Sequence, residues 1–212
     1  MKLKLLVPTS LADIKLREYQ HFIEVFDGNE EMDEYYSGLK FLEIFCGLPY
    51  NEALQIKIKD LQEAVSKINK ALSEKPSLIH RFTLGDTEFG FIPKLDDMTF
   101  GEYIDIDENI TEWKNMHKAM AVLYRPIKDK RRDKYTIEKY KGDNYYEAML
   151  DMPMSVVMSA MLFFYNLEKE LLEVTIHSLS KQSKAIVSTL EHSSTTNGAG
   201  TIASTHSQKG TY

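Results

Sequence analysis

Several residue types that would point to particular chemistry are scarce or poorly spaced in this chain of 212 residues. The single cysteine, Cys46, excludes an internal disulfide and is typical of a protein from a reducing compartment. The six histidines include no pair three or four residues apart, so no helix face offers two imidazoles to one metal ion. We therefore expect no metal site and no cofactor, and an enzyme is the least favoured class of protein.

Long apolar runs and an excess of positive charge are also missing. The longest apolar stretch, residues 152–165, is shorter than the roughly 20 residues that a bilayer-spanning helix needs, and Pro153 and Ser155 interrupt it. The formal net charge of -6 argues against a general nucleic-acid-binding protein, which is normally basic overall. We expect a soluble protein made in the cytoplasm, without a membrane partner.

Helical patterning dominates the residues that are present. Apolar residues recur at helical spacing in five segments, which are 11–26, 31–46, 58–73, 110–124 and 154–178. Gly47 and Pro76 mark the ends of the second and third segments, and Pro153 suits the first turn of the last. These signals predict a fold that is mainly α, with a long C-terminal helix.

The middle of the chain has a different pattern. Residues 79–93 alternate between apolar and polar, and Gly85 and Asp86 stand where a tight turn would join two strands, which predicts a central β-hairpin. Thr99 precedes Glu102 by three residues, as in a capping box, and predicts a short helix near 100–104. The expected fold class is therefore α+β, a helical domain with one hairpin.

The centre of the core is expected in the helices that flank this hairpin. Apolar side chains follow helical spacing in the segment 110–124, and the first half of the last helix is apolar nearly all round. The residues predicted to form this core are Trp113, Met116, Met120, Phe163 and Phe164.

The C-terminal stretch, residues 193–212, contains nine Ser or Thr and three Gly, with almost no charge. Such a composition does not bury enough apolar surface to offset the entropy of ordering it. An arm of this kind becomes ordered when it lies across neighbouring subunits. We expect a helical domain over residues 1–178, with its hairpin near 79–93, and an extended polar arm over 179–212.

Two segments of opposite charge follow each other in the second half of the chain. Between residues 94 and 112 seven acidic residues stand against one lysine, and between 125 and 141 eight basic residues stand against three acidic ones. The acidic patch comprises Asp96, Asp97, Glu102, Asp105, Asp107 and Glu108. The basic patch comprises Arg125, Lys128, Lys130, Arg131, Arg132 and Lys134.

These patches have three interpretations. The simplest is a solvated helix start followed by a charged loop, because charge runs usually face water. In the second, the two patches meet across copies of the chain in a head-to-tail interface, and such interfaces close into rings when the rotation allows it. In the third, the basic patch contacts the phosphates of DNA without reading its sequence.

Five stretches give the chain its resemblance to a known class of proteins. They are residues 48–54 (LPYNEAL), 60–65 (DLQEAV), 89–93 (FGFIP), 98–103 (MTFGEY) and 116–126 (MHKAMAVLYRP). In this order, over roughly residues 1–175, the chain resembles small structural or assembly proteins of tailed bacteriophages, of the crAss-like, short-tailed type. The resemblance brings no catalytic residue with it.

What the resemblance implies is a virion component. It would be made in the host cytoplasm and incorporated in several copies as a connector or ring protein, with other copies, the portal and tail proteins as its partners. The alternative is a tail assembly chaperone that is absent from the mature particle.

Overall fold

The computed structural model describes residues 5–28, 33–132, 134–142 and 144–196. The chain divides into two compact units, Met1–Phe164 and Tyr165–Tyr212. The described part of the first unit contains a set of N-terminal helices, a four-stranded sheet and the start of the last helix. The described part of the second unit is the remainder of that helix. The mixed α+β fold expected from the sequence is confirmed.

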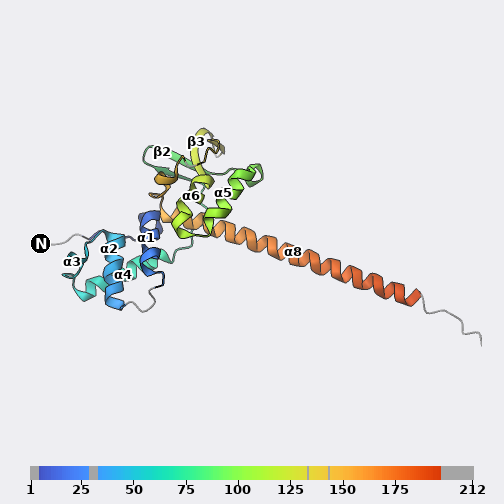
Figure 1. The fold of residues 1–212 in the computed structure, drawn as a ribbon, viewed down its shortest axis with the longest axis horizontal. Coiled ribbons are helices and arrows are strands. Elements are labelled where there is room, and N and C mark those ends of the chain that lie inside the picture. Colours follow the sequence, from blue (N-terminus) through green and yellow to red (C-terminus); the bar gives the residue numbers. More distant parts are fainter. Residues whose placement is uncertain (1–4, 29–32, 133, 143, 197–212) are drawn as a thin grey trace, which may run out of the picture. The chain divides into compact units, whose positions relative to one another are not determined.

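The N-terminal part of the first unit is helical. Its elements are the 3₁₀ helix η1 (Leu11–Asp13) and the α-helices α1 (Leu16–Phe26), α2 (Glu34–Cys46), α3 (Tyr50–Ala53) and α4 (Ile58–Leu72). Helix α2 is capped at its start by Asp33, whose side chain accepts hydrogen bonds from two backbone N–H groups, and at its end by Gly47, which has φ +62°. Helices α2 and α4 lie side by side (Figure 1), and Gly38 allows Leu61 to approach closely.

The first predicted helix, over residues 11–26, is broken at Ile14 and Lys15. Both residues are extended, and Lys15 forms an isolated antiparallel bridge with Pro153. Backbone hydrogen bonds on either side reinforce the bridge: Leu16 N–H donates to the Met152 carbonyl at 2.9 Å, and Met154 N–H donates to the Ile14 carbonyl at 2.8 Å. The break therefore arises from a long-range pairing that helical spacing does not report.

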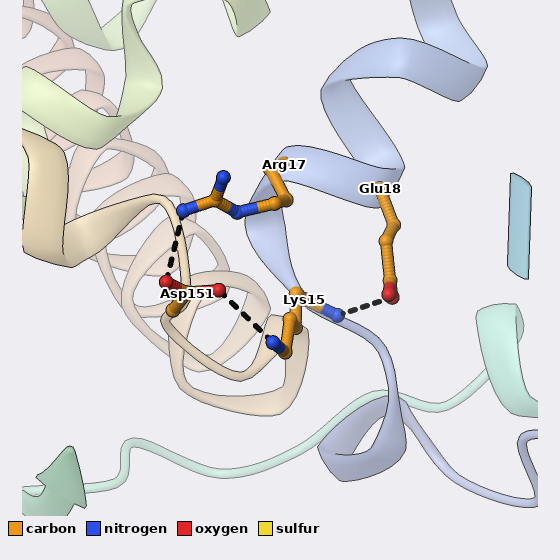
Figure 2. A network of polar contacts seen from close by, with 4 residues as sticks. All are labelled: Lys15, Arg17, Glu18 and Asp151. Atoms are coloured by element: carbon orange, nitrogen blue, oxygen red, sulfur yellow. Dashed lines mark hydrogen bonds and ion pairs between the residues drawn. The ribbon is translucent and has the colours of Figure 1, made fainter. Parts of the chain in front are cut away.

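Polar side chains reinforce the same junction, as Figure 2 shows. Lys15 Nζ lies 3.0 Å from Asp151 Oδ1, and Arg17 Nη2 lies 2.9 Å from Asp151 Oδ2. The backbone N–H of Lys15 donates to Glu18 Oε2 at 2.9 Å, which caps the start of α1. One carboxylate from the loop before the last helix thus holds two cations of the N-terminal segment.

The sheet has four antiparallel strands in the order β1-β2-β3-β4. Their bounds are β1 Arg81–Leu84, β2 Thr87–Phe91, β3 Tyr124–Arg131 and β4 Lys134–Ile137. The predicted hairpin is confirmed as β1 and β2, and Gly85 takes φ +57° in its turn. The basic segment after residue 125 forms a second hairpin, and β3 pairs with β2.

Helices fill the connection between β2 and β3. They are η2 (Leu95–Asp97), α5 (Phe100–Ile110), η3 (Trp113–Asn115) and α6 (Met116–Leu123), and α6 and α5 lie near the strands in Figure 1. The capping box predicted at Thr99 and Glu102 is confirmed at the start of α5, but the helix continues to Ile110, beyond the predicted range of 100–104. The predicted helix over residues 110–124 is divided: Ile110 ends α5, a 3₁₀ helix covers Trp113–Asn115, and the α-helix is Met116–Leu123. At its C-terminal end, Tyr124 leaves helical geometry and pairs with Phe91 in the sheet.

The core of the first unit is centred on α6 and the first turns of the last helix. Met116 and Met120, both predicted core residues, are 1% and 0% exposed. Trp113, Phe163 and Phe164, the other predicted core residues, are partly buried and pack against this cluster. The short helix α7 (Tyr146–Met149) and the helix α8 (Met154–Thr196) complete the fold.

Helix α8 continues beyond its predicted end at residue 178. Residues 179–196, expected to belong to an extended arm, have helical backbone, and the remaining arm residues, 197–212, lie outside the described residues. Ile186 and Leu190 are four residues apart and continue the helical spacing, a signal that the surrounding lysines and serines weaken. None of the described helices carries an apolar stretch long enough to cross a bilayer.

Candidate functional site

Residues from both predicted charge patches line one cleft of about 650 Å³ in the first unit, here called the Arg125 cleft. Its walls come from the connection after β2, the first turn of α5, β3, β4 and the segment after β4. The residues that matter most for its chemistry are Lys94, Thr99, Glu102, Arg125, Tyr135 and Tyr140. The cleft thus joins segments that are far apart in the sequence.

A buried ion pair forms the base of this cleft. Arg125 Nη1 lies 2.6 Å from Glu102 Oε1, and the two side chains are 9% and 5% exposed. Arg125 is placed by β3, where it pairs with Gly90 of β2, and Glu102 is placed by the first turn of α5. The two predicted patches therefore meet within one chain at these residues. Neither residue belongs to an exposed patch, contrary to the expectation from the sequence.

The second oxygen of Glu102 is fully engaged by the capping box. The Thr99 backbone N–H and hydroxyl donate to Glu102 Oε2 at 2.6 and 2.8 Å. Burial alone would raise the pKa of Glu102, but the hydrogen bonds from Thr99 and the charge of Arg125 outweigh it, and the pKa lies below its usual value. Glu102 is therefore an ionised, immobile partner that meets Arg125 through a single oxygen.

Tyr140 covers the guanidinium of Arg125 from another side. The Arg125 Cζ lies 6.0 Å from the centre of the Tyr140 ring, within range of a cation–π contact. The Tyr140 hydroxyl donates to Asp105 Oδ2 of α5, which holds the ring in place. Burial, and then this hydrogen bond, raise the pKa of Tyr140, so the phenol stays protonated at neutral pH.

One polar atom of Arg125 has no partner among the described residues. Arg125 Nε is buried and has no hydrogen-bond acceptor among the described residues. Buried N–H groups in folded proteins are nearly always paired, and an unpaired one costs about 1–3 kcal/mol. Arg125, which lines the cleft, therefore also carries one enclosed donor that the described residues leave unsatisfied.

The other members of the acidic patch have different environments. Asp96, Asp97, Asp107 and Glu108 are exposed, while Asp105 is half-buried and accepts the Tyr140 hydrogen bond. Asp97 lies 3.8 Å from Lys94, an exposed pair. For the exposed acids the alternatives weighed from the sequence, a solvated surface or an interface between copies, stay open.

The other members of the basic patch follow the β3–β4 hairpin. Lys128, Lys130, Arg131, Arg132 and Lys134 are all exposed. Lys130 Nζ pairs with Glu88 Oε1 of β2 at 2.8 Å, across the sheet. Arg132 takes φ +55° at the hairpin turn. Contacts of this surface with another copy or with DNA phosphates stay predictions.

A larger cleft of about 810 Å³ lies between α1 and the segment around η3. Its lining includes Arg17, Gln20, His21 and Trp113. Gln20 Nε2 donates to the Trp113 carbonyl at 2.7 Å and lies 3.3 Å from His117 Nδ1, a residue outside the cleft lining, so the amide of Gln20 is already engaged. Burial, followed by the charge of Lys118, lowers the pKa of His117 and keeps the imidazole neutral. The smaller cleft is therefore the stronger candidate.

The second unit presents an apolar stripe on helix α8, formed by Tyr165, Leu172, Ile176 and Leu179. These side chains are between 58% and 65% exposed. Residues three, four and seven apart share one face of a helix, and this spacing matches the a and d positions of a heptad, with Lys169 in the same stripe. Val174, 67% exposed, lies on the opposite face. This α8 stripe is a candidate interaction surface.

Among the described residues, no three His, Cys, Asp or Glu side chains come close enough together to hold a metal ion. Comparisons with protein-family models, with curated proteins and with solved structures return no match to this chain. The two candidate surfaces, the Arg125 cleft and the α8 stripe, thus rest on their own geometry.

Proposed function

We propose that this protein is a structural component of a tailed-bacteriophage particle, present in several copies as a connector or ring protein between portal and tail. The proposal joins the resemblance of residues 1–175 to such proteins with one observation, the exposed α8 stripe. Its work is association rather than chemistry.

The α8 stripe supports association because of what an exposed apolar helix face costs. Single helices gain little stability from backbone hydrogen bonds alone, and most of their stability comes from packing an amphipathic face. Tyr165, Leu172 and Leu179 are seven residues apart and mostly exposed, so their burial requires a partner. A helix from another subunit meets this need, since knobs-into-holes packing uses the same spacing on both helices.

Self-association in solution is the first test. The full chain is purified and its mass is measured by analytical ultracentrifugation over a wide concentration range, with the double variant Leu172→Glu/Leu179→Glu beside it. We expect an oligomer for the wild type and a monomer for the double variant, because two buried carboxylates per helix oppose packing. Val174→Glu is the matched control, which adds one charge to the opposite face and leaves the oligomer intact.

Presence in the particle is the second test. Mass spectrometry of purified particles is expected to find the protein in multiple copies, and removal of residues 179–212 is expected to reduce its incorporation. A protein that is missing from particles, yet is recovered with an unassembled tail protein, is instead the tail assembly chaperone. Two results together contradict the proposed role of the C-terminal region: the wild-type chain stays monomeric in solution, and the chain without residues 179–212 is incorporated normally.

A further inference from the structure

We propose that the outward face of α5 binds the tip of the β3–β4 hairpin of a second copy of this chain. The α5 face comprises Phe100, Tyr103, Ile104, Asp107 and Glu108, and the hairpin tip comprises Arg131, Arg132 and Lys134. The inference rests on the proposed function, which is association between copies. It deepens that function by naming a contact in the first unit that is separate from the α8 stripe.

The α5 face points away from the core of its own unit. Its five members lie at positions i, i+3, i+4, i+7 and i+8 counted from Phe100, and residues at this spacing share one side of a helix. Glu102 and Ile106, on the opposite side of α5, are buried. Phe100 is 77% exposed and Tyr103 is 56% exposed. Helix α5 therefore packs one side on its own unit and leaves aromatic rings uncovered on the other.

Carboxylates stand beside these rings on the same face. Asp107 and Glu108 are exposed and follow Tyr103 and Ile104 by one turn of the helix. An arginine guanidinium stacks on aromatic rings and forms paired hydrogen bonds with a carboxylate. The α5 face offers both kinds of group within about two turns of helix, so it suits an arginine-bearing partner.

The hairpin tip presents such cations in a fixed arrangement. Arg131 of β3 stands directly opposite Lys134 of β4 in the strand register, so the two side chains project from the same side of the hairpin. Arg132 lies at the turn, and all three residues are exposed. Like charges directly opposite each other destabilise a strand pair. An acidic partner would therefore stabilise the tip.

A second copy is the partner that supplies both surfaces at once. The described part of the first unit leaves the α5 rings and the tip cations exposed, so the two surfaces do not cover each other within one chain. Their charges are complementary, which favours contact between copies. Duplex DNA is disfavoured as the partner of the tip, because the chain has a net charge of -6 and DNA would leave the α5 face uncovered.

The two halves of this contact differ, so it passes head-to-tail from one copy to the next, as a closed ring requires. Exposed charges are screened by salt and contribute little individually. The contact is therefore weaker than the apolar packing of the α8 stripe, and it aligns copies that the stripe holds together.

The main test exchanges the charges of the two surfaces in the full chain. Arg131→Glu/Lys134→Glu makes the tip acidic, and Asp107→Lys/Glu108→Lys makes the α5 face basic, so each variant alone brings like charges together. We expect each variant to dissociate at a concentration at least about tenfold higher than the wild type in analytical ultracentrifugation. The variant with all four substitutions restores opposite charges at the wild-type net charge, and it is expected to associate as the wild type does.

Two matched controls accompany the charge exchange. Lys57→Glu/Lys59→Glu changes the net charge as much as the tip variant does, at exposed positions near the start of α4, and is expected to keep wild-type association. Tyr103→Ala is expected to raise the dissociation concentration about two- to fivefold through lost contact with a guanidinium. Tyr35→Ala, at a residue of nearly equal exposure, 55%, is expected to leave it unchanged.

The outcomes separate this inference from the proposed function. An oligomer that Leu172→Glu/Leu179→Glu dissociates but neither charge reversal weakens overturns the inference and leaves the α8 stripe in place. The opposite pattern supports the α5 contact and contradicts the role of the stripe. Failure of the folded four-substitution variant to recover association also overturns the inference.

A labelled DNA duplex tests the competing partner of the tip. We expect the wild type and Arg131→Glu/Lys134→Glu to bind the duplex equally weakly. Tight binding by the wild type that is lost in the tip variant, with association between copies unchanged, assigns the tip to nucleic acid and overturns the inference.

Discussion

The ring of Tyr135, on β4, lies directly against the backbone of Gly90, on β2. A Cβ atom at position 90 would stand 2.9 Å from Tyr135 Cδ2, closer than such atoms approach in folded proteins. The Tyr135 hydroxyl oxygen lies 2.8 Å from the Phe91 carbonyl oxygen and 3.2 Å from the His80 carbonyl oxygen. Tyr135 thus reaches across β3 and ties β4 to the first hairpin, and only glycine at position 90 leaves room for it.

Gly90→Ala is expected to destabilise the protein by about 1–3 kcal/mol, because the added methyl group overpacks the contact with Tyr135. The free energy of unfolding is measured by urea denaturation. Gly101→Ala is the control: Gly101 lies in α5 with nothing within 4 Å of its would-be Cβ, so alanine there is expected to be neutral or to stabilise by up to about 1 kcal/mol. Equal effects of both substitutions would contradict this account.

The buried pair of Glu102 and Arg125 predicts a strongly non-additive pair of substitutions. Arg125→Met leaves the Glu102 carboxylate buried without its cation and is expected to cost about 3–5 kcal/mol. Glu102→Leu in the same background removes that stranded charge, so the double variant is expected to be more stable than Arg125→Met alone. The measurement is a double-mutant cycle by urea denaturation, and additive losses would show that the two residues act separately.

The Glu102 carboxylate also predicts that the stability of the protein decreases at acidic pH. The folded-state pKa of Glu102 lies below its usual value of 4.5, so the stability it contributes is complete above that value and is lost as the pH falls through the folded-state pKa. Glu102→Gln cannot titrate, so its stability is expected to fall less steeply than that of the wild type below about pH 4.5. The free energy of unfolding is measured by urea titration at decreasing pH, and an equal decrease for the two proteins would refute the linkage.

The local signals of the sequence located several elements correctly. Gly85 in the hairpin turn, Gly47 at the end of α2 and the capping box of Thr99 with Glu102 each act through neighbours within a few residues, so pattern alone identifies them. The partner of Glu102 is Arg125, which follows later in the sequence, after α6 and at the start of β3. No local pattern encodes that pairing, and both residues therefore looked like members of exposed patches.

The end of a helix in the core was mispredicted for the same reason, because it depends on a partner far away in the sequence. Tyr124 continues the apolar spacing of α6, yet its backbone pairs with Phe91 and its hydroxyl donates to the Ile79 carbonyl, so the helix ends one residue earlier. On α8 the seven-residue spacing of Leu172 and Leu179 is visible in the sequence. Their exposure is not, because spacing shows which face is apolar and not whether the unit itself covers that face.

The ion pairs of Asp151, at the junction drawn in Figure 2, are expected to make a small, salt-dependent contribution to the stability of the protein. The hydrogen bond from Lys15, followed by the charge of Arg17, holds its pKa below the usual value against the opposing effect of burial. Because the three side chains are 40–53% exposed, Asp151→Asn is expected to cost at most about 1 kcal/mol at low ionic strength and less at high salt. Urea denaturation at both salt concentrations measures the effect.

Glu63→Gln is the control for Asp151, because Glu63 pairs with Lys67 on the same helix and connects no distant segments. Its cost is expected to be about 0.3–0.5 kcal/mol, as for other helix surface pairs. A loss well above 1 kcal/mol for Asp151→Asn, unaffected by salt, would mean that the carboxylate is needed for the backbone bridge between Lys15 and Pro153 rather than for its exposed pairs.

Cys46 is expected to be a slow nucleophile in the folded protein. Burial, and to a smaller extent the charge of Glu18, raise the pKa of its thiol from 9.0 to about 11. At pH 8 the thiolate fraction is then about 100-fold lower than for an unshifted thiol, since two pKa units separate the two states. The rate of alkylation by iodoacetamide, measured from pH 7 to 11 in native buffer and in guanidinium chloride, is expected to rise with a much higher midpoint in the native protein. A native midpoint near 9 would show that the thiol at the end of α2 is open to solvent.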